Sequence, residues 1–82
     1  MANLDLVATR VAELGGTVVT FNEAGVVLWS AHKRTSQGMR TVFNTHNVSF
    51  NEGKADLYWG HYDMELGAAV DSMDGKIAKS HY

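Results

Sequence analysis

The chain of 82 residues contains no cysteine and no proline. The absence of cysteine excludes disulfide bridges and thiolate metal sites, and the absence of proline fits a compact unit with little linker. No apolar run approaches the roughly 20 residues that a membrane-spanning helix needs, and the N-terminus lacks the basic-then-apolar pattern of a signal peptide. The sequence therefore predicts one small cytoplasmic domain, residues 1–82, without a membrane segment.

Charged residues of the two signs are separated along the chain, although the net charge is only −2. Residues 32–40 contain Lys33, Arg34 and Arg40 but no acid. The stretch from 52 to 74 contains one lysine and six acids, which are Glu52, Asp56, Asp63, Glu65, Asp71 and Asp74. Such a separation can steer a charged partner towards one end of a molecule, and solvated loops and helix faces produce the same pattern without a partner.

Residues 4–14 have the spacing of an amphipathic helix. Apolar residues recur every three or four positions, at Leu4, Val7, Ala8, Val11 and Leu14. Asn3 is suited to the N-cap, and Gly15-Gly16 allows the left-handed turn that ends a helix. We expect this helix to pack on the core of the domain, in preference to binding a partner.

A β-hairpin is predicted next, from residues 17–21 and 26–31, which are rich in β-branched and aromatic side chains. The loop between them matches a type I turn that begins at Asn22 and is closed by Gly25 in the left-handed conformation. This loop pairs Asn22 with Val26. The register then predicts one face that carries Val19, Phe21, Val27 and Trp29.

Residues 39–50 are also extended, as either one long strand with a bulge or two shorter strands. Asn51-Glu52-Gly53 predicts a turn into a further strand. Alternation in that strand directs Ala55, Leu57 and Trp59 to one side, and Tyr58, Gly60 and Tyr62 to the other.

At Asp63 the pattern changes from strand to helix. Apolar residues recur with helical spacing at Leu66, Ala69, Val70 and Met73. Asp63 is suited to the N-cap, and Glu65 adds favourable negative charge to the first turn. Asp74-Gly75 predicts the end of the helix, after which residues 76–82 form either a short extension docked through Ile77 or a loose tail.

These elements predict an α+β domain with two layers. The simplest way to bury every apolar face is one antiparallel sheet of three to four strands, with the N- and C-terminal helices on the same face. The other face of the sheet, with Tyr58 and Tyr62, is then open to water or to a partner.

No catalytic, cofactor-binding or metal-binding motif stands out. No serine has a G-x-S-x-G setting, and Gly15-Gly16 follows a helix, which is the wrong polarity for a phosphate-binding loop. The four histidines lack the spacing of a zinc site, and only His61 and Asp63 form a His-x-Asp pair suited to weak binding. We therefore expect a protein that is not an enzyme and holds neither a metal nor a cofactor.

The predicted open face favours binding of another protein. Tyrosine and tryptophan are enriched at protein interfaces, and acids around the second helix suit a basic partner surface. The residues expected to contact the partner are Tyr58, Tyr62, Asp56, Glu65 and Asp71. A short chain without cysteines or linkers is typical of single-purpose inhibitors or modulators, including those that phages direct against host machinery; this last step is an analogy.

Two alternatives stay open. Lys33, Arg34 and Arg40 suit contacts with nucleic-acid phosphates, and the helix–strands–helix order resembles that of double-stranded-RNA-binding domains over most of the chain. That family has lysines at the start of its second helix, where this chain has Asp63-Met64-Glu65, so the resemblance is one of topology and implies no residue role. The other alternative is a homodimer formed through the open face or an edge strand.

Overall fold

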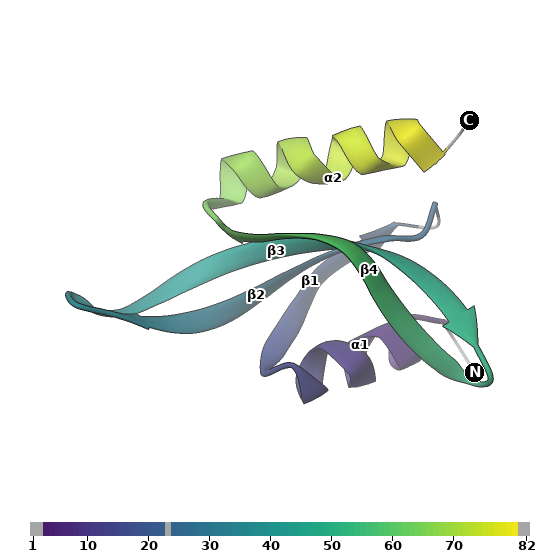
Figure 1. The fold of residues 1–82 in the computed structure, drawn as a ribbon, viewed down its shortest axis with the longest axis horizontal. Helices are drawn as coiled ribbons and strands as arrows, with labels where there is room; N and C mark the ends of the chain where they lie inside the picture. The colour runs from purple at the N-terminus through teal and green to yellow at the C-terminus, as the bar shows by residue number, and fades with distance from the viewer. Residues whose placement is uncertain (1–2, 23, 81–82) are drawn as a thin grey trace.

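The computed structural model describes residues 3–22 and 24–80 (Figure 1). The elements are α1 (Asn3–Glu13), β1 (Gly16–Asn22), β2 (Val26–Thr35), β3 (Gly38–Asn51), β4 (Lys54–Met64) and α2 (Leu66–Ser80). The strands form one antiparallel sheet in the order β1-β2-β3-β4. The predicted α+β class and order of elements are confirmed, and residues 39–50 belong to a single strand. Within the described ranges, no helix is long and apolar enough to cross a membrane.

The two helices cover opposite faces of the sheet, so the expectation that both lie on one face is wrong (Figure 1). Val27 of β2 belongs to a core cluster with Val7 and Val11 of α1. Its neighbour Val26 belongs to a second cluster with Met73 of α2. Successive side chains of a strand point to opposite faces, so the two clusters lie on the two sides of the sheet. The domain therefore has three layers in place of the predicted two.

The start of β2 explains this arrangement. The four consecutive apolar residues from Val26 to Trp29 are all buried, with at most 4% exposure. A strand with apolar residues on both faces needs cover on both faces. Two helices on one side would leave Val26 and Leu28 in water.

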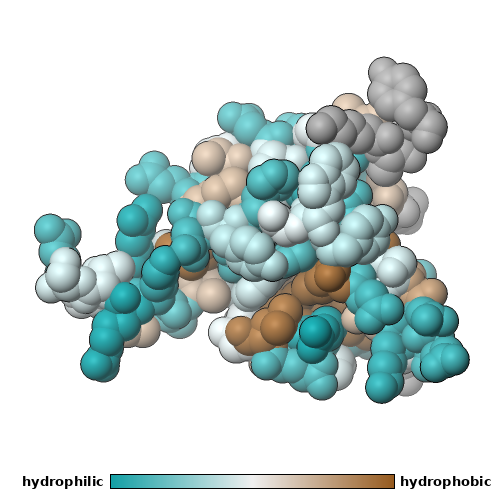
Figure 2. Space-filling model, viewed as in Figure 1, coloured by the Kyte–Doolittle hydropathy of each residue, from teal (hydrophilic) through white to brown (hydrophobic). Residues whose placement is uncertain are grey.

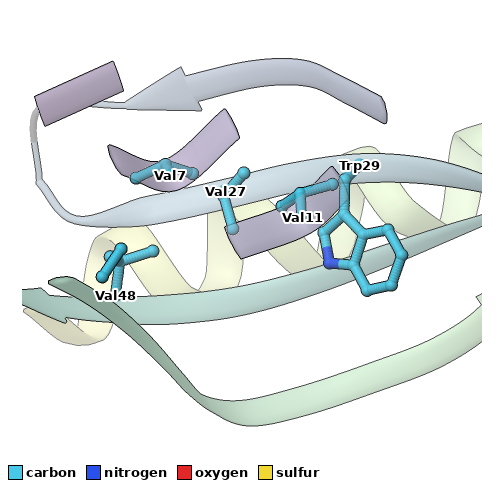
Figure 3. Packing of buried hydrophobic residues seen from close by; sticks show 6 residues of the cluster. Val7, Val11, Val27, Trp29 and Val48 are labelled. Atoms are coloured by element: carbon cyan, nitrogen blue, oxygen red, sulfur yellow. The ribbon is translucent and has the colours of Figure 1, made fainter. Parts of the chain in front are cut away.

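The core on the α1 side is built mainly from valine (Figure 3). Figure 3 shows the two valines of α1 facing Val27, Trp29 and Val48 of the sheet. Gly16 allows β1 to approach Trp29 closely, because a Cβ at this position would lie 2.2 Å from the indole ring. Helix α1 contacts both edge strands, β1 and β4, which indicates that the twisted sheet curves around it.

Strand β1 contains a bulge that was not expected from the sequence. The register shifts after Val18, which lies opposite Trp29, and Val19 is left 50% exposed. The predicted common face is therefore wrong for Val19, although it holds for Phe21, Val27 and Trp29.

Both predicted turns are present. Gly25 has a φ of 89°, and its N–H donates to the carbonyl of Asn22 over 2.9 Å. At the other turn Asn51 pairs with Lys54, so Glu52-Gly53 is a two-residue loop with φ values of 53° and 76°. Two consecutive positive φ angles are typical of a type I′ hairpin turn.

Helix α2 begins later than predicted. Asp63 lies in β4, so it is not the N-cap. The carbonyl of Glu65 accepts a hydrogen bond from the N–H of Ala69 over 2.9 Å, which places Glu65 at the position before the helix. Its side chain is therefore close to the positive end of the helix dipole, as expected.

Helix α2 also ends later than predicted. It continues past Gly75 to Ser80, because Lys76 and Ile77 have contacts with the sheet. Lys76 is 2% exposed and donates to the carbonyl of Trp59, and Ile77 packs against the α2-side cluster. Residues 76–80 are thus the docked extension, while residues 81–82 of the predicted segment lie outside the described residues.

Candidate functional site

Strand β4 has two β-bulges, and these decide where its aromatic side chains point. Thr45 and Asn47 of β3 are two residues apart, whereas their partners, His61 and Tyr58, are three residues apart. A second shift of the same kind follows near the end of β4. Within the first bulge Trp59 has a φ of 54°, an unusual value for a bulky residue. Each extra residue reverses the alternation of side chains beyond it.

The first bulge separates Tyr58 and Tyr62, which were expected to share one face. Tyr58 lies on the α2 side, in line with Asn47 and Val26 of the neighbouring strands. Tyr62 lies on the α1 side, where its hydroxyl is 2.7 Å from Nε2 of His46. Both rings are exposed as expected, by 51% and 60%, but the expectation of a common face is wrong.

Instead, the bulge brings the consecutive residues Tyr58 and Trp59 to the same side. Trp59 is 46% exposed, and the ammonium of Lys76 on α2 lies 4.2 Å from the centre of its ring. A cation at this distance attracts an aromatic ring, so the indole is held beside α2. The expectation that Trp59 points away from Tyr58 is wrong.

A groove of about 430 Å³ lies between β4 and α2. Its lining combines apolar surface with polar groups and comes from Trp59, His61, Met64, Ala68, Asp71, Ser72, Gly75 and Lys76. The groove is lined by one charge of each sign, and the carboxylate is the more accessible, because Asp71 is exposed while Lys76 is buried. Asp56 is exposed and lies two residues before Tyr58, on the same side of β4.

Hydrogen bonds connect the base of this groove to the sheet. The hydroxyls of Thr45 and Ser72 are 2.8 Å apart, and the Ser72 hydroxyl is 3.4 Å from Nδ1 of His61. The contact of the Ser72 hydroxyl with Thr45 is short and that with His61 is long. These distances indicate hydrogen bonds that hold β3, β4 and α2 together, and not a serine activated as a nucleophile by a histidine.

A second hydrogen-bonded chain lies on the α1 side. Nε1–H of Trp29 donates to Nδ1 of His46 over 3.0 Å, so the proton of neutral His46 is on Nε2 and is donated to the hydroxyl of Tyr62. Burial, with a smaller contribution from Lys76 and then His61, lowers the pKa of His46 to about 4. His46 is therefore neutral near neutral pH and orients the exposed ring of Tyr62.

The basic residues of the sequence lie on a projecting two-stranded ribbon, residues 32–41. β1 pairs with β2 only as far as Ala31, and β4 pairs with β3 only as far as Phe43, so the strands of the ribbon pair only with each other. The ribbon is the left arm in Figure 1, and Figure 2 shows mostly hydrophilic side chains along it. Lys33 pairs with Asp63, and Arg40 lies 3.8 Å from Glu65.

The sites expected from sequence are thus divided among three places. Asp56, Tyr58 and Asp71 lie on the α2 side, Tyr62 on the α1 side, and Glu65 at the base of the ribbon. His61 and Asp63 do not converge, because one contacts Ser72 and the other Lys33. Across residues 3–22 and 24–80, no group of three or more potential metal ligands is found.

The sequence did not predict that Trp59 lies on the α2 side of the sheet, nor that a groove lies beside it. The available signal was Gly60, since an isolated glycine within a strand pattern suggests a bulge.

Comparisons with protein-family models, curated proteins and solved structures found no match for the chain.

Proposed function

We propose that this chain is a non-enzymatic protein-binding module of the inhibitor or modulator kind. Its contact surface is the β4–α2 surface, defined here as Asp56, Tyr58, Trp59, Asp71 and the groove beside them. One observation carries the proposal: a bulge holds two consecutive large aromatic residues on the same side of an edge strand, both about half exposed. Buried tyrosine and tryptophan anchors supply most of the binding energy at many interfaces.

The backbone at Trp59 supports this assignment. A φ of 54° costs about 1–3 kcal/mol for a residue other than glycine and persists only where the surroundings fix it. Lys76 fixes it here, through the carbonyl and the ring of the same tryptophan. The indole is therefore pre-organised, which lowers the entropic cost of binding.

The chemistry of the groove indicates what it accepts. Trp59 and Met64 offer apolar surface, and Asp71 offers an accessible carboxylate. A partner segment with an apolar side chain beside a hydrogen-bond donor suits this site. The apolar group can pack on the exposed part of the indole that Lys76 does not cover, and the donor can meet the Asp71 carboxylate.

The experiment compares capture of partners from a lysate by the wild type and by two matched variants. In Tyr58→Ala/Trp59→Gly the aromatic pair is removed, and glycine accepts the positive φ. In the control, Tyr62→Ala, an equally exposed ring is removed from the opposite face. We expect a protein retained by the wild type and the control to be lost with the double variant, with all three showing the same circular dichroism. A partner lost equally with Tyr62→Ala, or retained by all three, would contradict the proposal.

A further inference from the structure

Two cations of the ribbon lie directly opposite each other. Lys33 and Arg40 are cross-strand partners and so share one face, with side chains that are 53% and 52% exposed. Like charges at opposed positions repel and destabilise a strand pair. Asp63 and Glu65 offset this repulsion in the free protein, and an anionic ligand bound to the two cations would offset it as well.

The third cation occupies the other face of the ribbon. Arg34 lies opposite Met39, which is 65% exposed. Among residues 3–22 and 24–80, no carboxylate forms an ion pair with Arg34. The sequence contains no acid between residues 24 and 51, so the ribbon presents positive charge on both faces and no negative charge of its own.

The tip of the ribbon is held by its own hydrogen bonds. The hydroxyl of Thr35 donates to the carbonyl of Gly38 over 2.9 Å and accepts from the N–H of Gln37 over 3.2 Å. A closed turn of this kind reduces the entropy lost when the ribbon is fixed by a ligand.

From these features we propose that the ribbon binds double-stranded nucleic acid by lying in a groove and contacting phosphates with Lys33, Arg34 and Arg40. The major groove of B-form DNA admits a two-stranded β-ribbon, and both walls of a groove carry phosphates, which matches cations on both faces. This site is separate from the β4–α2 surface and does not depend on the function proposed for it.

The carboxylates at the base of the ribbon modulate this site. Asp63 and Glu65 pair with Lys33 and Arg40 in the free protein. Exposed ion pairs contribute little to stability, so a phosphate readily replaces a carboxylate. The variant Asp63→Asn, which removes the charge of Asp63, should therefore release Lys33 and tighten binding of the nucleic acid. Asparagine is chosen because it tolerates the φ of 60° at this position.

The test measures fluorescence anisotropy of a labelled B-form DNA duplex with the full chain between about 50 and 200 mM salt. Three phosphate contacts predict a slope of log K against log salt of about −2.7. Arg34→Gln should reduce this slope by about 0.9, and Asp63→Asn should tighten binding several-fold. Lys54→Gln removes a cation at the far end of β4 and should change nothing, as should Tyr58→Ala/Trp59→Gly.

Several results would overturn the proposal. They are no anisotropy change at the lowest salt, an equal loss with Arg34→Gln and Lys54→Gln, or equally tight binding of the single strand of the same sequence. A site that selects a duplex should also distinguish it from a flexible polyanion. Displacement of the labelled duplex by unlabelled duplex but not by an equal charge of polyglutamate supports the proposal, and equal displacement by both contradicts it.

Discussion

His46 lies between two aromatic side chains and is hydrogen-bonded to both. The centre of its ring lies 5.9 Å from that of Trp29, with the two ring planes inclined by 21°, and 5.0 Å from that of Tyr62, which it meets edge-on. The residue is 3% exposed, and protonation of Nδ1 would remove the acceptor that Trp29 uses. Neutral His46 is thus part of the α1-side core.

The lowered pKa of His46 predicts a dependence of stability on pH. In the unfolded chain His46 takes up a proton near pH 6.5, whereas in the folded chain it does so near pH 4. The unfolded state therefore binds more protons between these values, and the free energy of unfolding falls as the pH falls through this range. Urea denaturation at about pH 7, 6, 5 and 4 (one-unit steps across this window) should show a larger loss of the free energy of unfolding for the wild type than for His46→Gln. Parallel pH profiles would refute this explanation.

Gly60 is needed for the contact between His46 and Tyr62. A Cβ at this position would lie 2.4 Å from Nε2 of His46 and 2.7 Å from the Tyr62 hydroxyl. Gly60→Ala should therefore lower the free energy of unfolding by about 1–3 kcal/mol. Gly75→Ala is the matched control, because a Cβ at Gly75 would have nothing within 4 Å and alanine should stabilise the interior of α2 by about 1 kcal/mol. Similar urea midpoints for the two variants would contradict this explanation.

At the scale of helices, strands and turns, the sequence correctly predicted the elements that are specified by residues close together in the chain. Helix α1 and the turns at Gly25 and Gly53 depend on residues close together in the chain, and all three were found. The predicted apolar stripe of α1 is confirmed for Val7 and Val11, which are buried, and wrong for Leu4, Ala8 and Leu14, which are exposed.

The two bulges of β4 depend on the pairing with β3 and on Lys76 of α2. The residue pattern of β4 alone does not specify the two bulges. The sequence pattern accordingly predicts the strand-to-helix change at Asp63, three residues before α2 begins.

The β3–β4 hairpin offers a test at this scale. Glu52 has a φ of 53° in the turn, and asparagine followed by glycine is the preferred pair for this turn type. Glu52→Asn should raise the free energy of unfolding by about 0.5–1 kcal/mol. Glu52→Gln removes the same charge but keeps the conformational penalty, so it should give no gain in thermal unfolding. An equal gain for both variants would show that charge is the cause.

At the scale of the whole molecule, the position of the helices follows from the apolar run at Val26–Trp29. An alternating pattern in this strand predicts one covered face and one open face. Four buried residues in succession indicate two covered faces. This signal was present in the sequence, whereas the choice of which helix covers which face depends on packing across the sheet.

The helices that cover the two faces of the sheet also restrict how two copies of the chain could associate. With a helix on each side, the sheet offers no open face to a second copy, and both edge strands, β1 and β4, contain bulges that interrupt strand addition. We expect light scattering at high concentration to give the monomer mass of 9.0 kDa. A dimer mass would contradict this expectation and would support the homodimer hypothesis.

The β4–α2 surface depends on the placement of Trp59 and Tyr62 of β4 on opposite faces of the sheet. A nuclear Overhauser spectrum measures this placement directly. The indole protons of Trp59 should show cross-peaks to Lys76 of α2, and the ring protons of Tyr62 should show cross-peaks to His46 but none to α2. Cross-peaks from Trp59 to Val11 of α1, or from Tyr62 to α2, would contradict the opposed faces described for this strand.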